Sequence, residues 1–183
     1  AAAEAGVGSV LHLTNGLYSY TGTLTIDKAF SVVSTNGPEK TKIYSTNGGG
    51  TAGTRVVYLS DPGAVLAGVD VTSGSISRGG VLMSAGTVTN CYVCNYRTSD
   101  SGPGVYMTGG TLTDCLVTNN CIGTHSRYGI AIYAMGECTI QRCRIFDNWL
   151  DFSPTQAGGS YGTVYLNGAN AKILNSLVVG NRA

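Results

Sequence analysis

The sequence is poor in charged residues and contains no long apolar run. Asp, Glu, Lys and Arg make up 11% of its 183 residues, whereas an average protein has about 25%. The 11 basic residues are balanced by 10 acidic ones, so no excess of positive charge favours binding to nucleic acid. No run of about 18 apolar residues occurs, so we expect no membrane-spanning helix. Because 43% of the residues are hydrophobic, the chain can still build a core.

Side chains that serve catalysis or metal binding are also scarce. His12 and His125 are the two histidines, and neither has a serine or cysteine partner that the sequence identifies as part of a triad. Cys91 and Cys94 form one isolated CxxC pair, without the second pair or the histidines of a zinc site. No segment gathers the acidic residues that a calcium site needs. We therefore expect neither a metal nor a cofactor.

What the chain does have is an internal repeat built around a short apolar segment. Its central position, mostly cysteine, is occupied in turn by Val69, Cys91, Cys115, Cys143 and Ser176. The spacings are 22 (69 to 91), 24 (91 to 115), 28 (115 to 143) and 33 (143 to 176) residues. No window has the period of an α-helix, and the shorter spacings are typical of one turn of a parallel β-solenoid with three short strands.

Three motifs carry a resemblance to a known family. They are Gly79-Gly80-Val81, Asn90-Cys91-Tyr92-Val93 and Asn181-Arg182-Ala183. They resemble the right-handed parallel β-helix repeat proteins of the pectin-lyase-like superfamily, in particular the polymorphic outer-membrane proteins and autotransporter passengers. The beginning of the chain is similar as well, with strands expected at 10–13, 24–26 and 31–34, a turn at Gly16-Leu17-Tyr18, and a further turn and strand over 36–43.

The resemblance implies an all-β fold, a right-handed single-stranded parallel β-helix of about 22–24 residues per rung. We expect a single domain over 1–183, with entry strands and a first rung in 1–50 and regular rungs in 51–183. We also expect the native chain to continue past Ala183 and the protein to be secreted or exposed at the cell surface. This fold hosts lyases, hydrolases, epimerases, adhesins and inert stalks, so it does not by itself give an activity.

Residues that recur once per turn should stack into ladders along the coil, because neighbouring strands lie about 4.8 Å apart. Two buried ladders are predicted, one at the cysteine position and one formed by Val71, Val93, Val117, Ile145 and Val178. A turn ladder is predicted for the polar residues that follow, which are Asn95, Asn119, Asn120, Asp147, Asn148 and Asn181. Asparagine tolerates left-handed backbone and its amide can bond the next amide, so a structural role explains this ladder fully.

A further ladder is expected to point outward. Strand alternation buries the neighbours of Tyr58, Tyr106, Tyr133 and Tyr165, with Leu82 in the remaining rung, so these side chains should face solvent. An exposed aromatic stripe could bind the sugar rings of a polysaccharide or pack against another protein chain. The alternative is that the rings stack on one another beneath inserted loops.

The extra residues of the longer repeats enter at one place, around 96–104, 120–130 and 148–162. They predict loops of growing length along one edge of the coil, and loops on a rigid scaffold often carry function. The candidates for ligand binding in these loops are His125, Tyr128, Trp149 and Tyr161. Arg127 and Asp151 could converge with them.

Candidates for catalysis are weaker, and they are Asp114, Arg142 and Asp151. A glycosidase needs two carboxylates about 5 to 10 Å apart on one cleft, and outward-facing acids are sparse in this chain. Asp114 and Arg142 lie on neighbouring rungs and are more simply interpreted as a surface ion pair. No catalytic residue is therefore assigned from the sequence.

Three functions remain open. The first is a secreted or cell-surface module with a structural, adhesive or glycan-binding role. The second is a polysaccharide lyase or glycoside hydrolase that acts in the cleft beside the inserted loops. The third is a subunit that associates with itself into an extracellular filament or surface layer.

Overall fold

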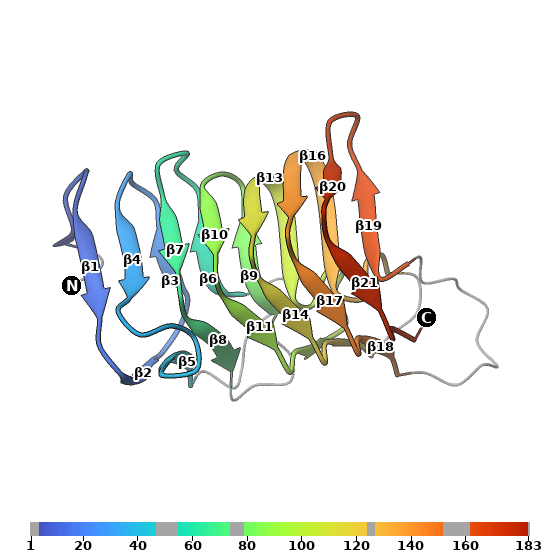
Figure 1. The fold of residues 1–183 in the computed structure, drawn as a ribbon, viewed down its shortest axis with the longest axis horizontal. Coiled ribbons are helices and arrows are strands. Elements are labelled where there is room, and N and C mark those ends of the chain that lie inside the picture. The colour runs from blue at the N-terminus through green and yellow to red at the C-terminus, as the bar shows by residue number, and fades with distance from the viewer. Residues whose placement is uncertain (1–3, 47–54, 74–78, 124–126, 152–161, 183) are drawn as a thin grey trace.

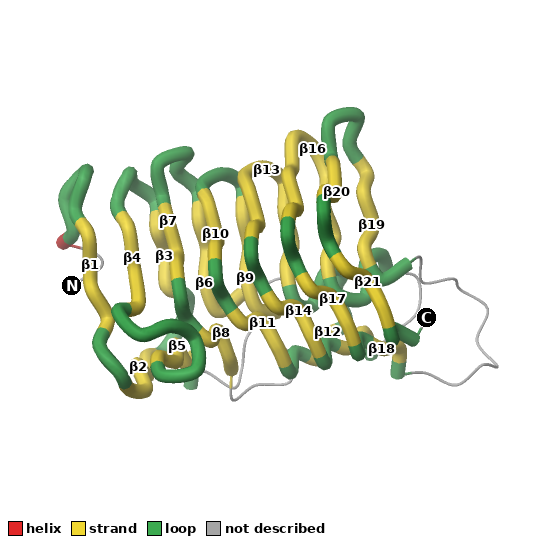
Figure 2. Tube along the Cα trace, in the orientation of Figure 1, coloured by secondary structure: helices red, strands yellow, loops and turns green. Residues whose placement is uncertain are grey.

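The computed structural model describes residues 4–46, 55–73, 79–123, 127–151 and 162–182. In these ranges the chain winds into a coil of short parallel strands and contains no α-helix (Figures 1 and 2). None of these residues forms a helix that is long and apolar enough to cross a membrane. The coil advances from β1 (Val10–Leu13) at one end to β21 (Leu177–Val179) at the other. The expectation of an all-β parallel β-helix is confirmed.

The strands stack at four places around the coil. One stack, here the tyrosine stack, contains β3 (Leu24–Ile26), β6 (Arg55–Leu59), β9 (Gly79–Met83), the first parts of β13 (Val105–Thr113) and β16 (Ile132–Gln141), and β19 (Val164–Asn167). The next stack contains β1, β4 (Ser31–Ser34), β7 (Val65–Ala67), β10 (Thr87–Thr89), the second parts of β13 and β16, and β20 (Lys172–Leu174). Since β13 and β16 run through both stacks, these strands form a single 11-stranded sheet.

The other two places are separate sheets. A 7-stranded sheet consists of β2 (Gly16–Tyr20), β5 (Thr41–Ser45), β8 (Asp70–Ser73), β11 (Tyr92–Cys94), β14 (Leu116–Thr118), β17 (Arg144–Phe146) and β21. A 3-stranded sheet consists of β12 (Arg97–Thr98), β15 (Cys121–Ile122) and β18 (Trp149–Leu150).

Parallel pairing already begins with the first strands. β1 pairs with β4, β2 with β5 and β3 with β6. The expected turn at Gly16-Leu17-Tyr18 is therefore wrong, because these residues belong to β2. All five positions of β2 have a partner in β5, and this long-range pairing extends the segment into a strand.

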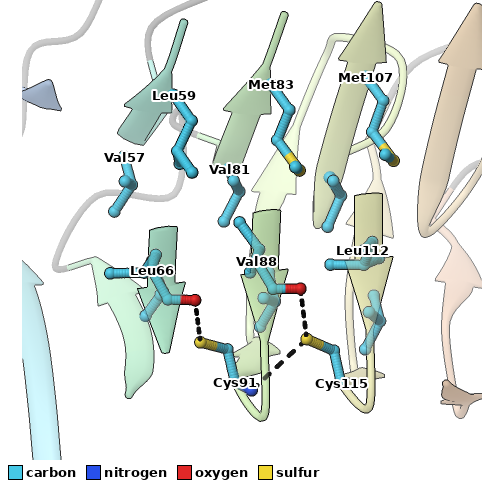
Figure 3. Close-up of a cluster of buried hydrophobic side chains, with 14 of the residues drawn as sticks. Val57, Leu59, Leu66, Val81, Met83, Val88, Cys91, Met107, Leu112 and Cys115 are labelled. Carbon is cyan, nitrogen blue, oxygen red and sulfur yellow. Dashed lines mark hydrogen bonds between the residues drawn. The ribbon is translucent and has the colours of Figure 1, made fainter. Parts of the chain in front are cut away.

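The core is built from residues that alternate along the strands and stack across them. Val57 and Leu59 of β6, and the equivalent Val81 and Met83 of β9, are fully buried, and Figure 3 shows these side chains pointing into the coil. The predicted valine and isoleucine ladder is also buried from Val71 to Ile145, except that Val178 is 44% exposed because its strand is the last of its sheet.

The cysteine ladder is buried as predicted from Val69 to Cys143, whereas Ser176 in the last rung is half-buried. None of the six thiols is in a disulfide. The sulfur of Cys91 donates to the carbonyl oxygen of Leu66 at 3.8 Å, and that of Cys115 to the carbonyl oxygen of Val88 at 3.7 Å (Figure 3). Each sulfur also lies 3.1 Å from a carbonyl oxygen of its own rung, that of Thr89 for Cys91 and that of Thr113 for Cys115, so the thiols contact carbonyl groups of two neighbouring rungs. Burial raises the pKa of Cys94 and of Cys121 to about 11, so both thiols stay protonated at neutral pH.

The polar turn residues form two neighbouring columns rather than one. The left-handed column holds Asn95, Asn119, Asp147 and Gly180, with φ between 52° and 68°. The adjacent column holds Asn120, Asn148 and Asn181, and the first two are fully buried. The side-chain amide of Asn120 donates to Oδ1 of Asn148 at 2.9 Å, and that of Asn148 to Oδ1 of Asn181 at 2.9 Å. The structural interpretation of this ladder is confirmed.

The inserted stretches do not begin as loops. Each of them starts with one of the two-residue strands β12, β15 and β18, which pair in parallel. The expectation that Trp149 lies in a loop is therefore wrong, because it lies in β18 and its position pairs with that of Cys121. Immediately before β15 the backbone N–H of Asn120 donates to Oδ1 of Asn148, and immediately before β18 the backbone N–H of Asn148 donates to Oδ1 of Asn181. These bonds fix where the strands of the 3-stranded sheet begin.

Candidate functional site: the tyrosine face and its cavity

The outer surface of the tyrosine stack, here the tyrosine face, carries the aromatic stripe. The strand register places Tyr58, Leu82, Tyr106, Tyr133 and Tyr165 side by side on successive rungs. Their neighbours along β6, β9, β13 and β16 are buried in the core, as the alternation predicts, whereas in β19 Val164 is half-buried and Leu166 is exposed. The stripe therefore exists, on the outside of the coil.

The tyrosine rings contact one another instead of lying open. The ring centroids of Tyr106 and Tyr133 are 5.0 Å apart, and those of Tyr133 and Tyr165 are 5.5 Å apart with nearly parallel planes. Tyr128, from the inserted stretch, stacks on Tyr165 at 4.6 Å. Because the ring faces of Tyr106, Tyr133 and Tyr165 are used by neighbouring rings, this part of the stripe presents mainly ring edges and hydroxyl groups. The Tyr128 ring that covers its end is 36% exposed.

A cavity of about 440 Å³ adjoins the stripe at Tyr106. It is lined by Arg55, Leu82, Asp100, Ser101, Tyr106 and Arg127. Arg55, Asp100 and Ser101 were not recognised from the sequence. The sequence contains one signal for Arg55. It alternates along β6 with the same spacing as the buried Val57 and Leu59, so its side chain should also point inward. A charge at an inward position indicates either a buried partner or a functional site.

The Arg55 guanidinium forms the floor of this cavity and holds the adjacent segment. Arg55 is 4% exposed, and it donates to the carbonyl oxygens of Gly102 at 2.6 Å and Ser101 at 2.9 Å. Its guanidinium carbon also lies 5.6 Å from the ring centroid of Tyr106. Loss of hydration lowers the pKa of Arg55 to about 10, so the group still carries its charge at neutral pH.

Glycine on the next rung gives this guanidinium its space. Gly79 pairs in register with Arg55, and a Cβ at Gly79 would overlap the Arg55 side chain. The position of the buried charge therefore depends on a residue 24 positions further along the chain (55 to 79).

The opposite wall of the cavity comes from the inserted stretches. The exposed Arg127 donates from Nε to the carbonyl oxygen of Ser99 at 2.8 Å, and the backbone N–H of Tyr128 donates to Oγ of Ser101 at 3.0 Å. The half-buried Asp100 lines the same cavity as Arg55 and Arg127. Two guanidinium groups, one carboxylate and a phenol can together bind the hydroxyl and acidic groups of a sugar chain.

Asp114 and Arg142 form the ion pair expected between neighbouring rungs. Nε and Nη2 of Arg142 each lie 2.8 Å from a different carboxylate oxygen of Asp114, and Thr113 donates to the same carboxylate. These hydrogen bonds lower the pKa of Asp114 to about 2. Both residues lie on turns with left-handed backbone, and neither lines the cavity on the tyrosine face.

This pair predicts a pH-dependent difference for Asp114→Asn, which keeps a residue tolerant of left-handed backbone. The folded pKa is about 2, below an unfolded value of about 3.9, so the pair stabilises the protein above pH 4 and this contribution is lost as the pH falls toward 2. Both side chains are exposed, and solvent screening keeps the effect to about 2 °C in melting temperature. Thermal unfolding at pH 6 and pH 2 should show a gap between the two proteins that closes at pH 2, and a constant gap would contradict the pairing.

The other predicted residues lie in different places. Asp151 follows β18 and forms an ion pair with Arg97, so it does not join Asp114 and Arg142 in one site. Trp149 is half-buried, and its ring N–H donates to Oδ1 of Asn119 at 3.4 Å. His125 and Tyr161 lie outside the described residues. The roles proposed for these side chains stay predictions.

Within the described ranges, no cluster of three or more His, Cys, Asp or Glu residues could hold a metal ion. In the lining of the cavity on the tyrosine face, Asp100 is the one carboxylate. The chemistry available there is therefore that of guanidinium, carboxylate, hydroxyl and phenol groups.

Comparisons with known proteins agree with this architecture. The model of the family described as right handed beta helix region matches residues 15–183. A crystal structure of pectin methylesterase in complex with a hexasaccharide is similar, with a TM-score of 0.55 and 11% sequence identity. The match covers 91% of this chain and 60% of that chain, so the likeness shows the fold and not the activity. A comparison with curated proteins found no match.

Proposed function

The chain belongs to the right-handed β-helix family, and we propose that it is a secreted or cell-surface module that binds a polysaccharide along the tyrosine face. In this fold the outward-facing residues are where a ligand can bind. The observation that supports this most is the cavity of about 440 Å³ beside Tyr106, with Arg55 and Arg127 in its lining. The stacked tyrosines continue this surface along the coil axis, which suits an extended chain.

Two features favour a sugar chain over a protein partner at this surface. The cavity is concave and carries Arg55, Asp100 and Arg127 in its lining, whereas the core of a protein interface is flatter and generally depleted in charged residues. The side chains of Arg55 and Ser101 are held by contacts within the coil, so little ordering is needed on binding.

Retention on immobilised neutral and acidic polysaccharides tests this proposal. We expect Arg127→Ala to weaken retention at least tenfold, because the exposed guanidinium is the part of the cavity that a ligand reaches first. Arg144→Ala is the matched control, since Arg144 is an exposed arginine on the 7-stranded sheet. Retention that is absent for the whole panel, or equal in the two variants, would contradict the proposal.

A second candidate is an enzyme that acts on the bound glycan, and it is favoured by Asp100, whose carboxylate shares the cavity with both arginines. A hydrolase would need a second carboxylate, and the described lining contains one, so a lyase or an esterase fits better.

The pectin methylesterase of similar fold makes pectin of high and low methyl-ester content a suitable part of the panel. Chain shortening or methanol release that Asp100→Asn abolishes would establish an enzyme, and retention without either product would leave a binding module.

A further inference from the structure

A second cavity, of about 510 Å³, lies at the corner between the 7-stranded and the 3-stranded sheets. Its lining consists of Asn119, Asp147, Asn148, Trp149, Gly180 and Arg182. None of these residues lines the cavity on the tyrosine face. We propose that this corner is a separate site for a neutral sugar ring, with Trp149 as the stacking surface.

The cavity exists because one rung of the left-handed column lacks a side chain. Asn95, Asn119 and Asp147 occupy this column on three successive rungs, and Gly180 occupies it on the fourth. The amide of Asn119 donates to Oδ1 of Asn95 at 2.6 Å, so two side chains of this column on neighbouring rungs contact each other. Gly180 contributes no side chain, and a Cβ added there would lie 3.3 Å from Oδ1 of Asp147, so a larger residue at this position would enter the cavity beside that carboxylate.

The indole of Trp149 is held at the side of this space. Its ring N–H donates to Oδ1 of Asn119 at 3.4 Å, and its backbone pairs with Arg182 and with Cys121 in the 3-stranded sheet. The side chain is half-buried, so part of the ring remains accessible. A fixed and partly open aromatic ring provides an apolar surface for the C–H face of a pyranose.

The charges at this corner select among ligand classes. Asp147 and Arg182 are exposed, and within the described ranges no ion pair joins their side chains. An anionic ligand would meet the Asp147 carboxylate, and a cationic ligand would meet the Arg182 guanidinium. A neutral polyol satisfies both, because adjacent hydroxyls can donate to the carboxylate and accept from the guanidinium. Together with the ring surface of Trp149, this pattern fits a neutral pyranoside.

The single tryptophan of the chain makes the proposal directly measurable. Fluorescence excited at the red edge of the absorption band, where tyrosine does not absorb, reports on Trp149 alone. Titration with the methyl glycosides of glucose, galactose and mannose and with N-acetylglucosamine then observes this corner and not the tyrosine face. We expect a saturable change in emission with at least one of these sugars. No saturable change with any of them would overturn the proposal.

Gly180→Asn is the decisive variant. Asparagine tolerates the left-handed backbone of Gly180, whose φ is 66°, and its side chain would fill the space beside Asp147. Gly37→Asn is the matched control, because Gly37 also has positive φ and an added Cβ there meets nothing within 4 Å. We expect Gly180→Asn and Asp147→Asn to weaken the titration at least tenfold, with Gly37→Asn unchanged.

Variants separate this site from the polysaccharide surface on the tyrosine face. Arg127→Ala should leave the fluorescence titration unchanged, and Gly180→Asn should leave polysaccharide retention unchanged. If Arg127→Ala also removes the fluorescence response, or Gly180→Asn does not weaken it, the corner is not the binding site. Circular dichroism of each variant confirms that the coil is intact before the comparison is made.

Discussion

Replacing Asn148 with alanine is expected to lower the free energy of unfolding by about 3 kcal/mol. The side chain is fully buried and sits in the middle of the amide ladder. Its amide nitrogen donates to the carbonyl oxygens of Val117 and Phe146 and to Asn181, and its Oδ1 accepts from the backbone and side chain of Asn120. Alanine would leave several buried donors and acceptors without partners, and each such group costs about 1–3 kcal/mol.

Urea denaturation followed by circular dichroism measures this loss. Asn119→Ala is the neighbouring control, because Asn119 is exposed and its amide makes a bond to another exposed side chain. We expect it to cost about 1–2 kcal/mol, mainly because alanine tolerates the left-handed backbone of Asn119 (φ 53°) less well than asparagine does. Asn148→Asp should cost at least as much as Asn148→Ala, since it replaces the donating amide by an oxygen that faces acceptor oxygens. If the free energy of unfolding falls no more for Asn148→Ala than for Asn119→Ala, the amide ladder does not stabilise the turn between the 7-stranded and the 3-stranded sheets.

The periodic part of this structure could be predicted from the sequence because a residue that recurs once per turn has equivalent neighbours on each rung. The burial of Cys91 and Val93, the outward direction of Tyr106 and the pairing of Asp114 with Arg142 follow from the repeat alone. The exposed Val178 shows the limit of the argument, since its strand is the last of its sheet.

The 3-stranded sheet could not be predicted, because strands of two residues are too short to show an alternating pattern. Trp149 was placed in a loop for that reason, although the Asn148 before it anchors the start of the strand. The burial of Arg55 could not be predicted, because it depends on contacts with Ser101 and Gly102, which lie 46 and 47 residues further along the chain on an inserted stretch.

The largest effect on the tyrosine face is expected from Gly79→Ala, a change that adds one methyl group. The new Cβ would occupy the space of the Arg55 guanidinium, whose hydrogen bonds to Ser101 and Gly102 fix the cavity wall. The guanidinium would have to leave its buried position, and both carbonyl groups would lose their donor. We expect a loss of about 2–3 kcal/mol in stability, and a loss of polysaccharide retention of at least tenfold.

A double-mutant cycle tests whether this effect passes through Arg55. In an Arg55→Ala background the added methyl at Gly79 meets an empty space, so Gly79→Ala should then cost less than about 1 kcal/mol. Gly123→Ala is the control for adding a methyl group, because a Cβ at Gly123 makes only an ordinary contact of 3.6 Å with Arg97. If Gly79→Ala costs the same in both backgrounds, the glycine serves the backbone alone and the buried guanidinium is not what shapes the cavity. If the cost disappears in the Arg55→Ala background, one rung of the coil has been adapted to hold a charge at a position where the next rung has only glycine. This adaptation is the strongest sign that the tyrosine face has a function beyond stability.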